Sequence, residues 1–241
     1  MVTVISLARP VWRFVTRPVG TVRAVTTSRP HLILTYDDGP DPAATPGVLS
    51  SLAAFGATAT FFVLVPRARR NPSLLAEILA AGHEVALHGI DHARLTRFSA
   101  RAVLRRCRDG RCELEDLIGR RVRWFRAPYG ALLPRHWTAV RAAGLMPVGW
   151  GPTPGDWRPS IPETQLAADA LDGCARGGIL LAHDGFAGPD DGADDGPPPD
   201  IDRAKLATLM LSGLWERGLQ GRSLGDSLAH GRARSWAWFH R

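Results

Sequence analysis

Predicted strands alternate with helical segments along most of this chain, and this alternation constrains the fold more than any other feature. Helical segments with capping or terminating residues separate six strands, expected at 32–36, 58–65, 84–87, 122–125, 145–150 and 179–182. Strands that alternate with helices build a parallel sheet or barrel, because each crossover returns the chain to the same edge of the sheet. At 241 residues the chain suits one α/β domain with a full core.

Polar side chains follow the carboxyl ends of at least five of these strands. They are Asp37 and Asp38, His88 and His92, Arg126, Asp156, and His183. In an α/β barrel the carboxyl ends of the strands converge on one face, where active sites lie. A solvated turn would explain Asp37-Asp38-Gly39-Pro40 alone, but it does not explain all the clusters together. We therefore predict one site that draws on five strands.

A metal site is the first chemistry that these residues suggest. His88 and His92 are four residues apart, so one helical turn would place both imidazoles on the same side. Two histidines and a carboxylate, here Asp38, with a position left for water, are a common ligand set of catalytic zinc. Surface histidines without a ligand are the alternative, and we favour the metal because these residues directly follow strands. The sequence thus predicts one divalent metal, with zinc ahead of cobalt and manganese.

The remaining residues can complete a hydrolytic site. A divalent metal lowers the pKa of bound water toward about 7, and Asp37 would accept a proton from that water as general base. His183 would protonate the leaving group, although on its own it would be explained as a buried structural histidine. Arg126 would keep a carboxylate ionised. Asp156 would orient a histidine, beside an aromatic wall from Trp157.

Five ordered motifs identify a family resemblance. They are TYDDGP at 35–40, HGIDH at 88–92, RAPYG at 126–130, GDW at 155–157 and ILLAHD at 179–184. Their order and approximate spacing resemble those of the polysaccharide deacetylases, the NodB-homology domains of carbohydrate esterase family 4. The likeness runs from about His31 to Leu219. It implies a distorted (β/α) barrel of seven or eight strands and metal-dependent hydrolysis of an N-acetyl group from an amino sugar.

The resemblance also implies a role for each matching residue. The metal ligands would be Asp38, His88 and His92. The catalytic residues would be Asp37 as general base, Arg126 as its partner, His183 as general acid, and Asp156 as the carboxylate that tunes this acid. The substrate contacts would be the backbone N–H of Tyr129, as a donor to the oxyanion, and the acetyl-pocket walls Trp157 and Leu181.

Two positions depart from the family pattern. Gly89 stands where the family usually has serine or threonine, and loss of a hydrogen bond there would loosen His88 as a ligand. Thr153 stands where the family often has an earlier aspartate. Because Asp156 remains, we expect activity with altered tuning of the acid.

Two other functions are open. The same fold could hydrolyse another amide, such as a formamide on a lipid-linked sugar or a cyclic amide. A non-catalytic carbohydrate-binding relative is less favoured, because a structural metal site would require neither Asp37 nor His183. The expected partner is an N-acetylated carbohydrate, either a polysaccharide or oligosaccharide or a sugar linked to lipid or nucleotide.

Charge adds little to this assignment. The net charge is +7, and 29 of the 30 basic residues are arginine, so the surface favours anionic partners. We find no nucleic-acid-binding motif and expect no nucleic-acid partner. Three cysteines argue against a disulfide framework, and no apolar run is long enough to span a membrane.

The chain divides into a basic leader at 1–30, to which the sequence assigns no role, and a deacetylase domain at 31–241. Apolar residues alternate with Arg9, Arg13 and Arg17 in the leader, which predicts either contact with an anionic membrane or loose packing on the domain. The leader is a poor secretory signal. We therefore expect a cytoplasmic protein or one at the inner face of the membrane, with secretion as the alternative.

Residues 186–200 form an acidic segment rich in glycine and proline, which predicts a flexible loop directly after His183. An active-site lid and a tolerated insertion are the two explanations, of which we favour the insertion.

Overall fold

Seven strands form one parallel sheet in this computed structural model, which describes residues 20–240. In sheet order they are β6 (Met146–Pro147), β5 (Trp124–Phe125), β4 (Glu84–Gly89), β3 (Thr60–Leu64), β2 (His31–Asp37) and β7 (Ile179–His183), with β8 (Gln220–Arg222) paired to the start of β2. Every residue of β2 is buried, as expected for a central parallel strand covered on both faces.

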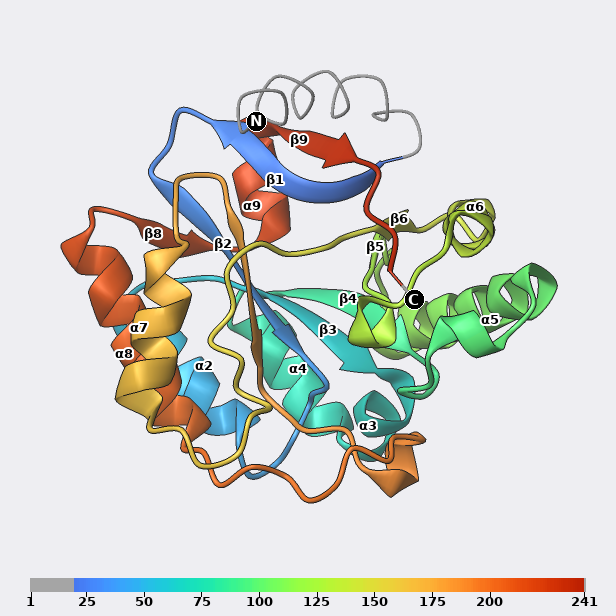
Figure 1. The fold of residues 1–241 in the computed structure, drawn as a ribbon, viewed down its shortest axis with the longest axis horizontal. Helices are drawn as coiled ribbons and strands as arrows, with labels where there is room; N and C mark the ends of the chain where they lie inside the picture. Colours follow the sequence, from blue (N-terminus) through green and yellow to red (C-terminus); the bar gives the residue numbers. More distant parts are fainter. Residues whose placement is uncertain (1–19, 241) are drawn as a thin grey trace, which may run out of the picture.

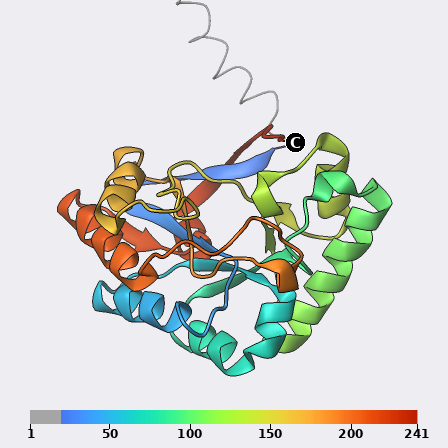
Figure 2. The ribbon, with the colours of Figure 1, turned by 60° about the horizontal axis from the view of Figure 1, so that its bottom comes forward.

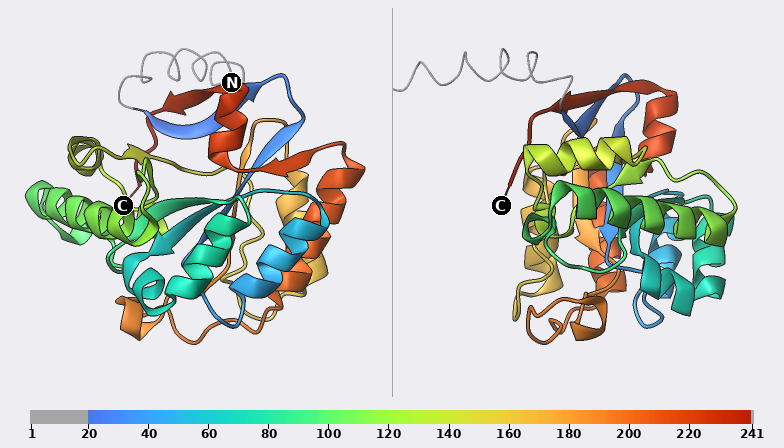
Figure 3. Two further views of the ribbon diagram at one scale, coloured as in Figure 1. Left: turned by 180° about the vertical axis from the view of Figure 1, so that it is seen from behind. Right: turned by 90° about the vertical axis from the view of Figure 1, so that its right-hand side faces the viewer.

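A two-stranded ribbon joins the two edges of this sheet. Strand β1 (Thr21–Thr27) pairs antiparallel with β9 (Gly231–Trp236), and β1 also makes isolated bridges to Val148 after β6 and to Gly178 before β7. The predicted distorted barrel is thus confirmed, and the ribbon closes it (Figures 1 and 3). Residues 21–27, expected to belong to the leader, form this strand instead. The basic residues at 9–17 lie outside the described residues.

Helices enclose the strands (Figures 1 and 2). They are α2 (Thr45–Ala54), α3 (Val65–Arg70), α4 (Pro72–Ala80), α5 (Ala100–Ile118), α6 (Pro134–Ala142), α7 (Glu163–Asp172), α8 (Arg203–Glu216) and α9 (Leu224–Ala229). The apolar faces of helices and strands share one large core, in which Leu52, Phe61 and Leu206 are fully or almost fully buried. None of the described helices is both long and apolar enough to cross a membrane.

Local capping explains several helix boundaries. The Ser99 hydroxyl accepts a hydrogen bond from the Ala102 N–H at the start of α5, and Gly119 ends that helix with a left-handed φ of 63°. Helix α4 begins at Pro72, so the next residue, Ser73, lies within the helix and does not cap it. The strand expected at 58–65 ends at Leu64, and Pro66 lies in the first turn of α3, where proline is tolerated.

The register of the sheet decides which polar residues meet at its carboxyl edge. Asp37 at the end of β2 is in register with His183 at the end of β7. Strands β4 and β5 pair one residue before His88 and Arg126, which makes these two residues neighbours. The strand ends thus carry the predicted groups to one place.

Candidate active site

Asp38, His88 and His92 come together at the ends of β2 and β4. Oδ1 of Asp38 lies 3.3 Å from Nε2 of His88 and 3.4 Å from Nε2 of His92. All three residues are buried, and their ligand atoms lie within 4.8 Å of one another. Asp38 Oδ1 is buried without a hydrogen-bond partner among residues 20–240, as expected of an oxygen that faces a cation. This donor set fits one divalent metal.

The two histidines do not share a helical turn, contrary to the prediction. His88 lies in β4, and His92 follows a bend after that strand. Nδ1 of His88 is 2.9 Å from the carbonyl oxygen of Arg126, so Nδ1 carries the proton and Nε2 keeps the lone pair that a metal needs. Burial lowers the pKa of His92 to about 4, although the negative charge of Asp38 acts in the opposite direction and raises it. His92 is therefore neutral and able to bind a metal at pH 7.

Asp37, the second carboxylate, is paired with Arg126 and not with the histidines. Arg126 Nη1 donates to Asp37 Oδ1 at 2.7 Å and to the Thr35 hydroxyl at 2.8 Å, and Nη2 donates to the Gly149 carbonyl oxygen at 3.2 Å. The side chains of Asp37 and Arg126 are only 4% and 1% exposed. Asp37 Oδ2 has a more distant neighbour, His88 Nε2 at 3.9 Å. This oxygen is the one available to accept a proton.

His183, the last residue of β7, is held by Asp156. Nδ1 of His183 lies 2.7 Å from Asp156 Oδ1, and its backbone N–H donates to Oδ2 at 2.8 Å. Arg203 at the start of α8 donates to the same Oδ2 at 3.0 Å and to the His183 carbonyl oxygen at 2.9 Å. Burial alone would lower the pKa of His183, but the charge and hydrogen bond of Asp156 raise it to about 9. His183 is thus cationic at neutral pH, as a general acid must be.

This pKa predicts a pH-dependent result. In metal-free protein, His183 should titrate near 9, above its usual value of 6.5, and Asp156→Asn should lower this pKa, because the charges of Asp38 and Asp37 then oppose the effect of burial without the larger effect of Asp156. The raised pKa means that the pair stabilises the folded state fully below pH 6.5 and loses this effect as the pH rises through 9. NMR titration of labelled histidines measures the shift, with exposed His230 as an internal control. A wild-type His183 that titrates near 6.5 would contradict the assignment.

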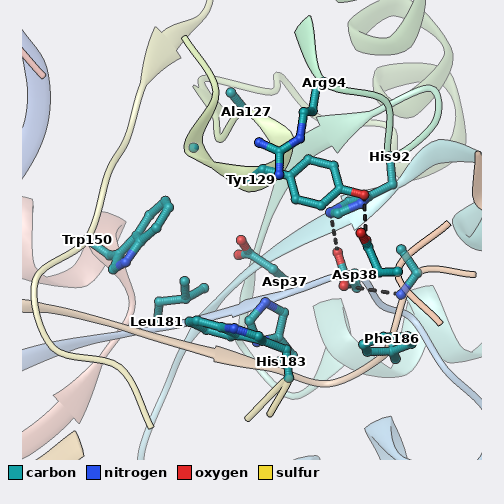
Figure 4. Close-up of a pocket in the computed structure, with 14 residues that line it drawn as sticks. Asp37, Asp38, His92, Arg94, Ala127, Tyr129, Trp150, Leu181, His183 and Phe186 are labelled. Atoms are coloured by element: carbon teal, nitrogen blue, oxygen red, sulfur yellow. Dashed lines mark hydrogen bonds and ion pairs between the residues drawn. The ribbon is translucent and has the colours of Figure 1, made fainter. Parts of the chain in front are cut away.

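Asp37, Asp38, His92 and His183 line one cavity of about 410 Å³, and His88, Arg126 and Asp156 contact them from outside its lining. Figure 4 shows Asp37, Asp38, His92 and His183 pointing into the same space from different elements. The predicted contact residues Tyr129, Trp157 and Leu181 line the cavity as well. All ten predicted site residues therefore lie together at the carboxyl end of the barrel. The individual roles, including that of the Tyr129 N–H, remain predictions.

A tryptophan wall that the sequence analysis did not identify completes the cavity. Trp150 lines the cavity, and its ring centroid lies 4.8 Å from that of Trp238, which follows β9. A Cβ atom on Gly130 would lie 2.7 Å from Trp150 and 2.9 Å from Trp238. The two rings therefore pack against a position that only glycine can fill. Residues after β9 thus support a wall of the cavity.

The acidic segment 186–200 lies across the carboxyl end of the barrel (Figure 2) and contacts both sides of the metal site. The Ala187 N–H donates to Asp38 Oδ2 at 3.2 Å, and the Asp191 carbonyl oxygen accepts from the His92 N–H at 2.6 Å. Buried Asp191 also forms an ion pair with Arg67 at 2.7 Å. The preference for an insertion is therefore not supported, because this segment lines the site.

Arg203 and Arg67 were both missed by the sequence analysis. Arg203 follows the helix-capping residue Asp202, and an arginine in the first turn opposes the helix dipole. That unfavourable position was a usable indication that Arg203 has a partner outside its helix. Arg67 carries no comparable pattern, because its partner Asp191 lies 124 residues further along the chain.

The two departures from the family pattern leave the site intact. A Cβ on Gly89 would lie 2.4 Å from the Asp91 carbonyl oxygen, so the turn after β4 excludes a side chain here. His88 is instead held through Nδ1, as described above. The hydroxyl of Thr153 accepts from the Gly155 N–H at 3.2 Å. Asp156, which is fully buried, is satisfied without it.

A ligand set for a divalent metal, a carboxylate outside that set and a cationic histidine, all at one end of a parallel α/β barrel, define a metal-dependent hydrolase. Sequence comparison specifies the class further. Residues 24–148 match the model of the family described as Polysaccharide deacetylase. The chain belongs to this family, as its five motifs predicted.

Individual relatives agree over most of the chain. A chitooligosaccharide deacetylase of Sinorhizobium fredii is 38% identical over 201 residues, which cover 82% of this chain and 92% of the relative. A chitooligosaccharide deacetylase of Azorhizobium caulinodans is 35% identical over 176 residues, covering 73% and 83%. The solved structure of peptidoglycan deacetylase PdaC from Bacillus subtilis matches with 28% identity and a TM-score of 0.70, covering 84% of this chain and 91% of that chain.

Proposed function

We propose that this protein removes the N-acetyl group from an amino sugar by metal-dependent hydrolysis. Family membership and relatives named chitooligosaccharide and peptidoglycan deacetylases support this reaction. The observation that carries the proposal is the convergence of three kinds of group on one cavity: a metal-ligand set, a carboxylate bound to arginine and a histidine bound to aspartate. A binding-only protein would require the first of these at most.

In this proposal Asp38, His88 and His92 hold zinc, for which two histidines and a carboxylate are a common catalytic ligand set. When bound, the ion supplies Lewis acidity, which polarises the acetyl carbonyl and acidifies a water molecule. Asp37 accepts the proton of this water as it attacks the carbonyl carbon.

The chain's other groups complete the reaction. Arg126 keeps Asp37 ionised and oriented, and the Tyr129 N–H donates to the developing oxyanion. His183 gives a proton to the amine nitrogen as the C–N bond breaks, which yields acetate and the free amino sugar. Trp157 and Leu181 would surround the acetyl methyl group.

Acetate release tests this function. The zinc-loaded protein should release acetate from at least one substrate in a panel of chitin oligomers, peptidoglycan fragments and N-acetyl sugars linked to nucleotide or lipid. A chelator should stop the release, and adding zinc, cobalt or manganese should show which metal restores it. Metal-loaded protein that releases no acetate from any of them would contradict the proposal and point to another amide.

Zinc should also stabilise the fold. At a free concentration 100 times the Kd, zinc should raise the free energy of unfolding by about 2.7 kcal/mol, because only the folded state unites the three ligands. His92→Ala should abolish most of this gain, whereas His230→Ala, an exposed histidine outside the site, should retain it. Urea denaturation with and without zinc measures the difference. Equal stabilisation of both variants would contradict the assigned ligand set.

A further inference from the structure

Arg94 is a cation of the cavity that the proposed reaction does not use. It is the guanidinium among the cavity-lining residues, and within residues 20–240 no hydrogen bond or ion pair engages it. Among the other charged groups of the cavity, Asp37 pairs with Arg126 and His183 pairs with Asp156, whereas Asp38 belongs to the metal-ligand set and Asp195 accepts a hydrogen bond from the Tyr129 hydroxyl. Within residues 20–240, none of these carboxylates thus forms an ion pair or a hydrogen bond with the Arg94 guanidinium.

The guanidinium is also held in place. Its Cζ atom lies 4.0 Å from the centroid of the Tyr129 ring, and this ring lies 4.4 Å from the ring of His92. Figure 4 shows Arg94 lying over Tyr129 at the edge of the cavity. Stacking on an aromatic ring fixes the plane of a guanidinium while leaving its N–H groups free. Arg94 is thus one aromatic ring away from a metal ligand.

A planar guanidinium matches carboxylate and phosphate, to which it can donate two parallel hydrogen bonds. Asp195 also lines the cavity, but it accepts a hydrogen bond from the Tyr129 hydroxyl and forms no ion pair with Arg94. A neutral N-acetyl sugar would offer Arg94 only uncharged acceptors, its hydroxyl groups and acetamide carbonyls. An anionic sugar would give Arg94 an ion pair that none of the described carboxylates forms with it.

We propose that Arg94 recognises a carboxylate or phosphate on the N-acetylated sugar or on the sugar next to it, so that anionic amino sugars are the preferred substrate class. This inference rests on the proposed deacetylase function. It makes Arg94 a specificity-determining residue, whereas the metal, Asp37 and His183 act on any acetamide in the cavity.

Matched substrates test the proposal. A chitin oligomer supplies the neutral sugar, an oligomer containing N-acetylmuramic acid supplies a carboxylate, its amide supplies the neutral analogue, and N-acetylglucosamine 1-phosphate supplies a phosphate. Wild type should favour one anionic substrate, and Arg94→Ala should reduce kcat/KM for it about 10- to 100-fold, mainly through KM, in line with charged hydrogen bonds. The kcat/KM for neutral substrates should change less than about threefold, because a neutral sugar forms no ion pair with Arg94 that the substitution could remove.

Three controls separate recognition from a structural effect. Arg97→Ala removes an exposed arginine three residues away that does not line the cavity, and it should change nothing. Arg94→Lys should keep part of the preference, because lysine has the positive charge but lacks the planar guanidinium that donates two parallel hydrogen bonds. Raising the salt concentration should weaken the preference in wild type and not in Arg94→Ala.

The outcomes distinguish this inference from the proposed function. Equal loss on neutral and anionic substrates in Arg94→Ala, or no anionic preference in wild type, would overturn the role of Arg94 and leave the deacetylase function standing. If no substrate is turned over, calorimetric binding of the same sugars to metal-loaded Asp37→Asn protein, with and without Arg94→Ala, still tests the preference. Tighter binding of the anionic sugar that Arg94→Ala abolishes would support it, and equal binding would reject it.

Discussion

Asp37→Asn should lower kcat for deacetylation by about 10²- to 10⁴-fold while the protein still binds its metal. The amide is nearly the same size as the carboxylate and can still accept the hydrogen bond from Arg126 Nη1, which is 2.7 Å long in the native protein. It cannot accept a proton from water. The loss should therefore fall on kcat and leave substrate affinity nearly unchanged.

Metal content and activity should be measured on the same samples. The variant should bind one equivalent of zinc, because Asp38, His88 and His92 are unchanged. Asp169→Asn provides a matched control, since Asp169 on α7 forms an exposed ion pair with Arg158. If Asp37→Asn keeps more than a tenth of wild-type activity at full metal occupancy, Asp37 is not the base.

Arg126→Met should cause the largest loss of stability. Removing one partner of a buried ion pair costs about 3–5 kcal/mol, because the other charge stays buried without compensation. Here that charge is Asp37, whose side chain is 4% exposed. Methionine fills much of the volume next to Phe62, over which the guanidinium lies at 4.2 Å. The loss should therefore reflect charge more than packing.

Denaturant unfolding of metal-free protein measures this effect. Arg69→Met is the control, because Arg69 pairs with Glu113 at an exposed site, where such pairs contribute about 0–1 kcal/mol. Adding Asp37→Asn to Arg126→Met should recover part of the stability, since the unpaired charge is then gone. A double variant less stable than Arg126→Met alone would show that packing and the hydrogen bonds to Thr35 and Gly149 dominate instead.

The central strands could be predicted because continuous apolar runs such as 32–36 and 179–182 occur where a strand is buried on both faces. The ribbon of β1 and β9 could not, because arginines such as Arg23, Arg232 and Arg234 interrupt any apolar run there. The expected strands at 122–125 and 145–150 shorten to two-residue pairings in β5 and β6. On this side of the barrel, β1 continues the strand pairing after β6 through the bridge between Val22 and Val148.

The site followed the same division. Most of its predicted residues lie at or shortly after strand ends, where the parallel register brings them together, whereas Asp156 and Trp157 lie further along, in the loop between β6 and α7. Their supporting partners come from segments with no local pattern. Asp191 lies in a segment whose composition suggests a loop, yet it is buried and bound to Arg67. Arg67 and Asp191 are 124 residues apart in the sequence, so no local pattern could have predicted that they pair.

The position of β9 has a consequence for how the protein is made. This strand follows every other described helix and strand in the chain, and Trp238 comes later still. Because a growing chain leaves the ribosome from its N-terminal end and folds in units as it emerges, the parallel sheet and all three metal ligands can assemble before β9 is available. The Trp150 wall gains its support from Trp238 only afterwards. The three metal ligands therefore do not depend on the last strand, whereas the packing of the Trp150 wall does.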